Sequence, residues 1–210
     1  DWGYSVEQTT DGGYIVAGDS DGDIYVLKTD GNGTELWSQT FGGLNDDVGF
    51  SIQQTNDGGF IITGKSSLGN GDYEVCLIKT DMNGVELWNK MFSLSGVDVG
   101  KSVCQTSDGG YVVTGSTHNF NGMFEVFIIK TDIGGNQQWV KNYGEGIGQS
   151  IQQTTDGGYI VTGDINGDIY ILKTDTYGDT LWTNTFVEGE GNSIQQTIDG
   201  GYIVTGTTLE

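Results

Sequence analysis

Apolar and polar residues alternate along short segments of this chain, and the segments recur at regular intervals. In one copy, residues 50–55 alternate with a period of two, residues 60–63 and 74–79 form short apolar runs, and residues 86–92 alternate weakly around Trp88. Alternation predicts a half-buried strand, whereas a short β-branched apolar run indicates a strand buried on both faces. The pattern therefore predicts four strands in this copy.

Short glycine-containing connections separate these predicted strands. Residues 56–59 read Asn-Asp-Gly-Gly and residues 81–84 read Asp-Met-Asn-Gly. Asp or Asn followed by Gly favours a tight hairpin, because Gly accepts positive φ without a steric cost. The second connection is followed, four residues after its last glycine, by a tryptophan in each of four copies: Trp37, Trp88, Trp139 and Trp182.

The first connection belongs to a motif, Asp-Gly-Gly followed by an aromatic residue, that occurs five times. It begins at Asp11, Asp57, Asp108, Asp156 and Asp199, with copies 43 to 51 residues apart. Four antiparallel strands in 40 to 50 residues are typical of a β-propeller blade. A solenoid of β-arches is the alternative, but its coils would not need two hairpins per repeat.

We therefore predict an all-β fold, a β-propeller of four-stranded antiparallel blades forming a single domain. The predicted blades are residues 1–46, 47–97, 98–145 and 146–187, and residues 188–210 supply the first two strands of a fifth. This gives 18 strands in a five-bladed ring whose last blade is incomplete and exposes an unpaired edge. A partner chain could fill that edge, so self-association there is a possible outcome. The chain starts and stops within a repeat, which we interpret as a piece of a longer protein.

The repeated phrases resemble a known family. Residues 54–64, Gln-Thr-Asn-Asp-Gly-Gly-Phe-Ile-Ile-Thr-Gly, and residues 172–182, Leu-Lys-Thr-Asp-Thr-Tyr-Gly-Asp-Thr-Leu-Trp, are similar to the DGGY-type propeller repeats of secreted and cell-surface prokaryotic proteins. The resemblance covers the whole chain. It implies an extracellular, usually non-enzymatic module, and it supplies no catalytic residues to transfer.

The composition excludes several partners. Eight Lys, no Arg and 29 acidic residues give a formal charge of −21, which repels nucleic acid and anionic membrane surfaces. No apolar stretch approaches the ~18 residues of a membrane-spanning helix. Cys76 and Cys104 occupy positions that the other copies fill with unrelated residues, so we expect two thiols, with a disulfide as the alternative.

Function is expected where the copies differ. The connection between the second and third strands is five residues longer in blades 2 and 3 than in blades 1 and 4. Variable loops on a rigid scaffold commonly carry binding residues. We predict a binding surface there, although the two loops packing on each other would be a simpler explanation. The candidate binding residues are Leu68, Asn70, His118, Asn119, Phe120 and Met123.

The two short connections raise the question of a metal. Oxygen-bearing side chains at alternate positions suit Ca²⁺, but the EF-hand glycine and bidentate Glu are absent, and an ordinary Asp/Asn-Gly turn explains the same pattern. The candidate ligands are Asp19, Asp21, Asp23, Asp164, Asn166 and Asp168. No other cofactor is expected.

An enzyme is the least favoured class. The innermost strands offer Glu7 alone, where other copies have Gln or Cys, and a glycosidase needs two carboxylates. The single histidine, His118, lies in a glycine-rich loop, a poor base for precise catalytic geometry. We therefore expect a non-enzymatic extracellular or cell-surface module that binds a glycan or protein. A structural spacer or fibre subunit is the alternative, and the sequence does not identify the ligand.

Overall fold

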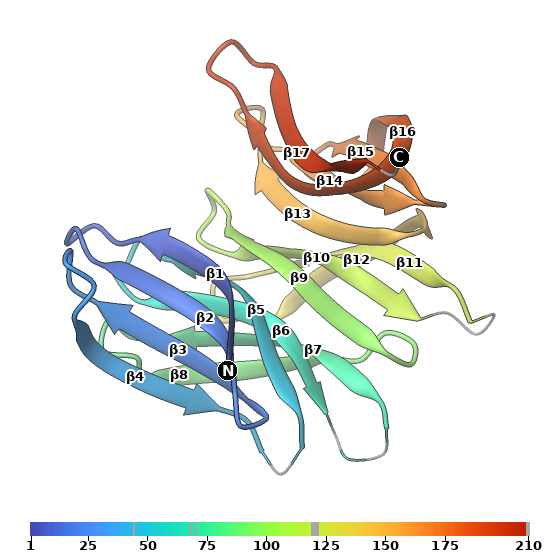
Figure 1. The fold of residues 1–210 in the computed structure, drawn as a ribbon. Coiled ribbons are helices and arrows are strands. Elements are labelled where there is room, and N and C mark those ends of the chain that lie inside the picture. The colour runs from blue at the N-terminus through green and yellow to red at the C-terminus, as the bar shows by residue number, and fades with distance from the viewer. Residues whose placement is uncertain (44, 68, 70, 119–121, 209–210) are drawn as a thin grey trace. The chain divides into compact units, whose positions relative to one another are not determined.

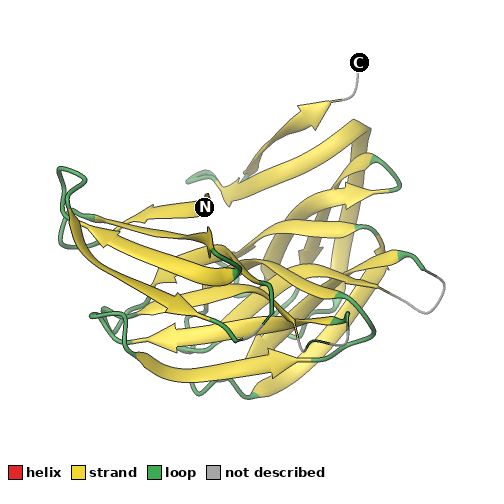
Figure 2. Cartoon of the chain, turned by 60° about the horizontal axis from the view of Figure 1, so that its bottom comes forward, coloured by secondary structure: helices red, strands yellow, loops and turns green. Residues whose placement is uncertain are grey.

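The computed structural model describes residues 1–43, 45–67, 69, 71–118 and 122–208, and the part of the chain it describes contains strands and loops only (Figures 1 and 2). The described residues accordingly hold no helix long and apolar enough to cross a membrane. The chain divides into two compact units, residues 1–103 and 104–210. Each unit is described by itself below.

The first unit contains two complete four-stranded antiparallel blades. In blade 1 the strand order is β1-β2-β3-β4, and in blade 2 it is β5-β6-β7-β8. The strands are β1 (Trp2–Gln8), β2 (Tyr14–Ser20), β3 (Asp23–Thr29), β4 (Glu35–Phe41), β5 (Asp47–Gln54), β6 (Phe60–Ser67), β7 (Tyr73–Thr80) and β8 (Glu86–Phe92).

The division between the units falls inside β9, the first strand of blade 3. The other strands of blade 3 and all of blade 4 belong to the second unit. Blade 3 has the order β12-β11-β10-β9, and the sheet that contains blade 4 has the order β13-β14-β15-β16-β17. The strands are β9 (Asp98–Gln105), β10 (Tyr111–His118), β11 (Phe124–Thr131), β12 (Gln137–Glu145), β13 (Ile147–Gln153), β14 (Tyr159–Ile165), β15 (Asp168–Thr174), β16 (Thr180–Gln196) and β17 (Tyr202–Thr208).

The predicted count of five blades and 18 strands is not confirmed. The described residues form four four-stranded blades and 17 strands, because β16 runs without a break from the fourth strand of blade 4 into the next hairpin. Its first half pairs with β15 and its second half with β17. The connection at residues 188–192 is short enough to stay extended, so no turn separates the two predicted strands.

The Asp-Gly-Gly motif is held by a lysine that the sequence analysis did not single out. In blade 1, Asp11 Oδ1 accepts hydrogen bonds from Thr9 Oγ1 (2.5 Å), Gly13 N (3.0 Å) and Lys28 Nζ (3.1 Å). Lys28 Nζ also donates to the carbonyl oxygen of Thr29 at 2.8 Å. Four such ion pairs occur, with N–O distances of 2.9–3.0 Å: Lys28–Asp11, Lys79–Asp57, Lys130–Asp108 and Lys173–Asp156.

The second glycine of the motif makes room for this lysine. A Cβ on Gly13 would lie 2.1 Å from Thr29 O and 2.5 Å from Lys28 Nζ, so no larger residue fits. The first glycine, Gly12, has φ +84°, a conformation that L side chains rarely adopt. Both glycines are therefore structural parts of the blade.

The aromatic residue of the motif packs against the tryptophan of the preceding blade. Ring centroids are 5.8 Å apart for Trp37 and Phe60, 5.9 Å for Trp139 and Tyr159, and 5.8 Å for Trp182 and Tyr202. Tilted aromatic pairs at this separation add stability beyond the apolar area they bury. Repetition of these two positions is thus explained by packing between neighbouring blades.

Candidate functional site

The strands that flank the two long connections are each one residue longer than their counterparts in blades 1 and 4. In blade 2 the ladder continues through the pairs Lys65–Val75 and Ser67–Tyr73, and in blade 3 it continues to the pair His118–Phe124. The strands therefore account for two of the five added residues in each blade, and ladder hydrogen bonds satisfy the backbone there. Of the predicted binding residues, Leu68, Asn70, Asn119 and Phe120 lie outside the described residues, while His118 and Met123 are described.

The described part of the blade 3 hairpin presents an apolar surface. The rings of His118 and Phe124 are 5.0 Å apart, and His118 Nε2 lies 3.0 Å from Gly122 O. Met123 and Phe124 remain 45% and 42% exposed. Both residues line a hollow of about 170 Å³ whose other walls come largely from blade 4 and its connection: Glu145, Gly146, Ile147, Asp164 and Asn166.

The short connections are two-residue hairpin turns. Asp21 and Gly22 have φ of 52° and 89° between the paired residues Ser20 and Asp23, and Asn166 and Gly167 repeat this at 54° and 84°. Positive φ at both central residues is the type I′ pattern that joins twisted strands. Among the described residues no group of three His, Cys, Asp or Glu side chains is arranged to hold a metal ion. The turn geometry accounts for the Asp/Asn-Gly pattern without a metal.

A more distinctive position lies inside the first strand of each blade. At this position each of the five copies has a Gly-x-Ser triplet in which only the middle residue changes: Tyr4, Phe50, Lys101, Gln149 and Asn192. The pairing with the second strand shifts register across this residue in blades 1, 2 and 4 and in the last hairpin. Such β-bulges re-aim side chains and are frequent beside functional sites.

The flanking residues of the triplet are structural, which leaves the middle residue variable. Ser5 Oγ accepts a hydrogen bond from Ile52 N, and Ser51 Oγ accepts one from Val103 N, both at 3.3 Å. A Cβ on Gly49 would lie 2.8 Å from Ile24 Cγ2, so only glycine fits that close approach. The middle residue of the triplet can therefore differ from copy to copy without disturbing the contacts between blades.

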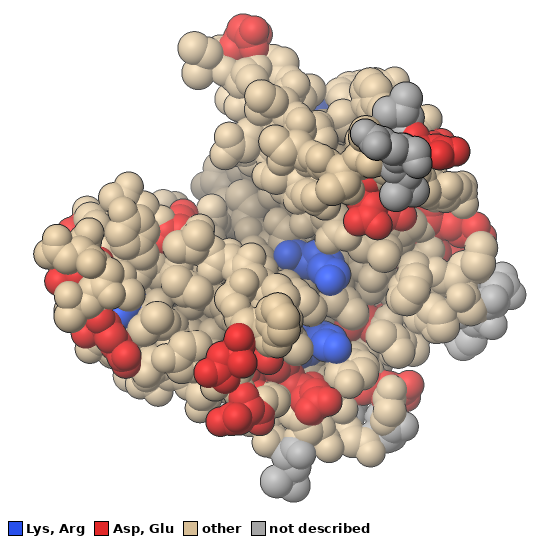
Figure 3. Space-filling view, viewed as in Figure 1, with Lys and Arg blue, Asp and Glu red and all other residues tan. Residues whose placement is uncertain are grey.

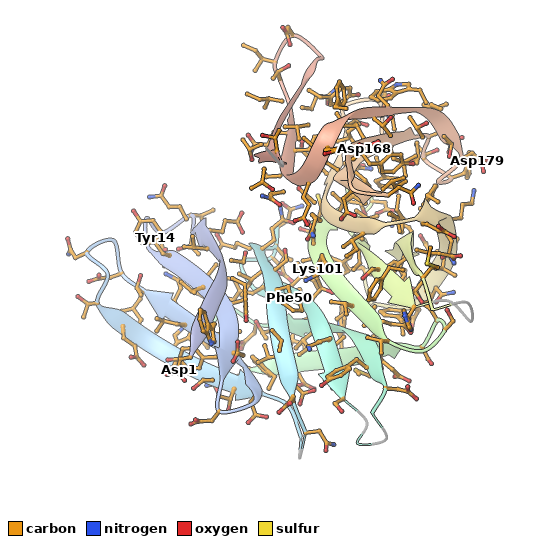
Figure 4. All side chains as sticks on the ribbon, turned by 45° about the vertical axis from the view of Figure 1, so that its right-hand side comes forward. Asp1, Tyr14, Phe50, Lys101, Asp168 and Asp179 are labelled. Atoms are coloured by element: carbon orange, nitrogen blue, oxygen red, sulfur yellow. The ribbon has the colours of Figure 1, made fainter. Side chains whose placement is uncertain are left out.

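In the first unit these middle residues form a column of aromatic rings and a cation. The ring centroids of Tyr4 and Phe50 are 5.1 Å apart, and Lys101 Nζ lies 4.0 Å from the Phe50 centroid. Figure 4 labels Phe50 and Lys101. Lys65 Nζ lies 4.2 Å from the Tyr73 centroid at the base of the long blade 2 hairpin. We call Tyr4, Phe50, Lys65, Tyr73 and Lys101 the cation–aromatic cluster.

The electrostatics of the cluster differ from those of the chain as a whole. On the face drawn in Figure 3, residues without charge cover most of the surface, acidic side chains form several patches, and basic ones are fewer. Half of the eight lysines are buried in the Asp-Gly-Gly ion pairs. Burial lowers the pKa of Lys101, and the nearby Lys65 lowers it further. Two cations that repel each other near aromatic faces form a site that an anionic group would stabilise.

The base of the blade 2 hairpin is held in place by a buried carboxylate. Asp47 is 1% exposed and accepts hydrogen bonds from Gly43 N (3.0 Å) and Ser67 N (3.2 Å). It therefore ties the connection between blades 1 and 2 to the start of the long hairpin. Lys65 and Tyr73 project from a rigid ladder and not from a loop.

A larger hollow, of about 590 Å³, lies between blades 3 and 4 in the second unit. Trp139, Tyr159 and Tyr177 are among its walls, and Tyr177 is 72% exposed. Its polar walls are mostly engaged already: Gln153 Oε1 accepts from Ser107 N and Gln153 Nε2 donates to Gly157 O. The hollow belongs to the repeated contact between blades, which makes it a weaker candidate than the cation–aromatic cluster.

Glu7 and the cysteines show no arrangement for catalysis. Glu7 Oε2 accepts a hydrogen bond from Gln54 N at 2.7 Å, as Gln152 Oε1 does from Gln196 N at 2.8 Å. Glu7 therefore takes the structural place of a repeat glutamine, and burial raises its pKa. Both cysteines are thiols, and burial raises the pKa of Cys76 to about 12, which disfavours the reactive thiolate.

Comparison with solved structures identifies the fold as a β-propeller. A protein of unknown function from Bacteroides caccae is 16% identical, with a TM-score of 0.63 over 90% of this chain and 63% of that chain. Chaetomium thermophilum Sqt1, solved bound to the N-terminus of ribosomal protein L10, is 13% identical, with a TM-score of 0.65 over 97% of this chain and 56% of that chain. The WD40 repeats of RRP9 are 9% identical, with a TM-score of 0.59 over 91% of this chain and 53% of that chain.

The chain spans 53% to 63% of the length of these three structures. No family model matches the sequence, and no curated protein matches it. At these identities the likeness concerns the fold alone.

Proposed function

We propose that the protein is a non-enzymatic recognition module whose ligand presents an anionic group to the cation–aromatic cluster. The observation that carries the proposal is Lys101 held 4.0 Å above the Phe50 ring, with Lys65 as the second cation. A carboxylate or sulfate would pair with the lysines, while Phe50 or Tyr4 would pack against an apolar or sugar face. The ligand is a glycan or a protein segment bearing such a group.

The cluster agrees with the predicted use of the long hairpins in recognition. Lys65 and Tyr73 lie on the two facing strands of the blade 2 hairpin, so a ligand that contacts them would also contact that hairpin. We propose that the recognition surface in the first unit includes this hairpin. In the second unit the exposed Met123 and Phe124 form a separate apolar surface.

An extracellular or cell-surface setting fits this role and the resemblance to DGGY-type repeats. A chain with a formal charge of −21 repels polyanions at long range, so an anion must be captured by the local arrangement of cations. This favours ligands with a single acidic group on an otherwise neutral body. Acidic monosaccharide units on a neutral glycan, or one acidic residue in an apolar peptide, have this character.

The test is a binding screen against paired ligands. An array would present glycans with and without a carboxylated or sulfated unit, and peptides with Glu or Gln at one position. We expect Lys101→Gln to weaken binding to the acidic members by about tenfold or more, because one charge-assisted contact is lost. Lys141→Gln is the matched control, since it removes the same charge from a lysine that pairs with Asp179 at the surface.

The result distinguishes recognition from a spacer role. Binding to acidic members that survives in Lys141→Gln and falls in Lys101→Gln supports the proposal. Equal binding by both variants, or no preference for acidic over neutral members, would contradict the proposal. A structural spacer would then be the better account.

A further inference from the structure

The hollow of about 590 Å³ between blades 3 and 4 is built on a repeated contact, but two of its lining residues depart from the repeat. Gln138 stands where the other outer strands have leucine, and Tyr177 stands where the other turns have Asn or Gly. The residues at the matching positions are Leu36, Leu87 and Leu181 for the first and Asn32, Asn83 and Gly134 for the second. Residues that serve every blade recur in every blade, so these two serve something particular to this contact.

A third departure fixes the turn that carries Tyr177. Tyr143 replaces a phenylalanine that occupies this position in the other three outer strands: Phe41, Phe92 and Phe186. The Tyr143 hydroxyl donates a hydrogen bond to Gly178 O at 2.7 Å, and Tyr177 N donates one to Asp175 Oδ1 at 2.9 Å. The backbone under Tyr177 is therefore tied to blade 3 as well as to its own turn, which lowers the ordering cost of binding.

The Tyr177 ring is open to a ligand. Its side chain is among the most exposed of the large apolar residues, and within the described part of the chain its hydroxyl makes no hydrogen bond. Trp139 supplies a second aromatic wall and is held in place by its contact with Tyr159. Tyr and Trp combine a large apolar face with a polar atom, so they suit ligands that are apolar on one side and wet on the other.

The rest of the lining is polar and its charges compensate. The Gln138 amide both donates and accepts hydrogen bonds, and Ser107 and Thr176 add hydroxyls. Asp108 Oδ2 and Lys130 Nζ form an ion pair at 2.9 Å. Among the described residues that line the hollow, none is Val, Leu, Ile or Met. The lining therefore fits a neutral ligand rich in hydroxyl groups better than it fits an aliphatic peptide side chain.

The size of the hollow suits a small ligand or one unit of a larger one. Its volume lies within the ~300–1,000 Å³ of small-molecule sites. A pyranose ring has an apolar C–H face and a rim of hydroxyl groups, which matches both parts of the lining. A nucleotide could also stack on an aromatic ring, but its phosphate would be repelled by a chain with a formal charge of −21.

We propose that this hollow is a second binding site, which takes a neutral pyranose unit of a glycan. The C–H face of the sugar packs on the Tyr177 ring, and its hydroxyl groups exchange hydrogen bonds with Gln138 and Thr176. The site lies wholly in the second unit and uses no residue of the cation–aromatic cluster, so it stands or falls separately from the anion site proposed above.

The test measures binding of neutral disaccharides to the whole chain. Maltose, cellobiose and lactose are titrated separately by calorimetry, and a neutral tripeptide, Gly-Leu-Gly, is titrated in the same way. Saturation-transfer NMR identifies the ligand protons that contact the protein. We expect at least one disaccharide to bind with a dissociation constant of about 0.1–10 mM, with its ring C–H protons in closest contact.

Variants that restore the repeat test the two lining residues with little risk to the fold. Tyr177→Asn introduces the residue of blades 1 and 2, and Gln138→Leu introduces the residue of the other three outer strands. We expect Tyr177→Asn to weaken binding about tenfold because the stacking face is lost, and Gln138→Leu about fivefold because a hydrogen bond is lost. Leu36→Gln makes the reverse exchange in blade 1 and should leave binding unchanged.

The outcomes separate this site from the anion site. Affinity for the disaccharides should be the same in Lys101→Gln as in the unaltered chain. If it falls in Lys101→Gln and not in Tyr177→Asn, the sugar binds in the first unit and the proposal is wrong. No binding of any disaccharide at about 20 mM, or undiminished binding by both repeat-restoring variants, would also overturn it. Binding of the tripeptide alone, lost in Tyr177→Asn, would identify a peptide site instead.

Discussion

Replacement of Asp156 by Asn should destabilise the protein far more than the same replacement at Asp199. The two carboxylates accept equivalent hydrogen bonds from a Thr hydroxyl and a Gly amide. Asp156 has one further partner, the Lys173 ammonium, which is only 3% exposed. The pair of variants therefore isolates the lysine.

The magnitude follows from the unequal burial of the two partners. Removing one member of a fully buried ion pair costs about 3–5 kcal/mol, because a buried charge is left uncompensated. Lys173 is buried, but Asp156 is 59% exposed, so solvent already screens part of the attraction. We expect a loss of about 2–3 kcal/mol in the free energy of unfolding for Asp156→Asn, and a clearly smaller loss for Asp199→Asn, which only weakens two hydrogen bonds.

The same ion pair predicts a dependence on pH. The hydrogen bond from Thr154 is the largest cause that lowers the pKa of Asp156 to about 2, against about 3.9 in an unfolded chain. A carboxyl whose pKa is depressed by folding stabilises the protein above its unfolded pKa and loses that contribution as the pH falls towards its folded pKa. Stability should therefore decline between about pH 4 and pH 2, less steeply in Asp156→Asn.

Urea unfolding followed by tryptophan fluorescence measures both effects. Trp182 lies opposite Lys173 in the pairing of β15 with β16 and packs on Tyr202, so it is the tryptophan beside the ion pair. If Asp156→Asn lowers the free energy of unfolding no more than Asp199→Asn does, then Lys173 is either neutral or needs no partner besides Thr174 O. The structural explanation of the repeated Lys-Thr-Asp phrase would then be wrong.

Three further predictions concern the turns, the metal and the cation–aromatic cluster. Gly59→Ala should cost more than about 2 kcal/mol by urea unfolding, because its Cβ would lie 2.2 Å from Thr80 O, whereas Gly43→Ala, with nothing within 4 Å, should be nearly neutral. Weak Ca²⁺ binding by Asp19, Asp21 and Asp23 predicts a melting temperature that rises slowly with millimolar Ca²⁺ after chelation; no rise above a matched ionic-strength control would reject that site. Burial and Lys65 lower the pKa of Lys101 from the ordinary value of 10.5, so Lys101 loses its charge at a lower pH than an ordinary lysine does. We therefore expect the affinity for an anionic ligand to fall at a correspondingly lower pH. Binding measured above pH 8 with the unaltered chain and with Lys65→Gln tests this.

The sequence predicted the blades because local signals and packing agree there. The Asp-Gly-Gly turns and the tryptophans recur at fixed places, and both proved to hold contacts within or between blades. It missed the lysine partners, although Lys-Thr-Asp recurs in four copies, because the two ends of each ion pair lie 17 or 22 residues apart. Nothing in a strand's own pattern reveals a partner at that distance.

The candidate site was predicted less well, for two physical reasons. Residues 65–67 and 116–118 are polar or small, so no alternation marked them as strand, and the ladder that extends them depends on tertiary pairing. The Gly-x-Ser triplets did carry a signal, since one residue varies between two constant ones. The sequence alone does not show that these variable residues meet in space; the structure does, because Tyr4, Phe50 and Lys101 lie in contact beside the bulge.

Within each repeat, the residues that hold the fold together can be told apart from the residues that are free to vary. Gly and Ser of each triplet hold neighbouring blades together, and Asp, Gly and Lys of each turn hold the blade itself, so these positions cannot vary without loss of packing. The middle residue of the triplet carries no such duty, so we propose that its chemistry is set by what it contacts outside the repeat, which in the case of Lys101 is an anionic group.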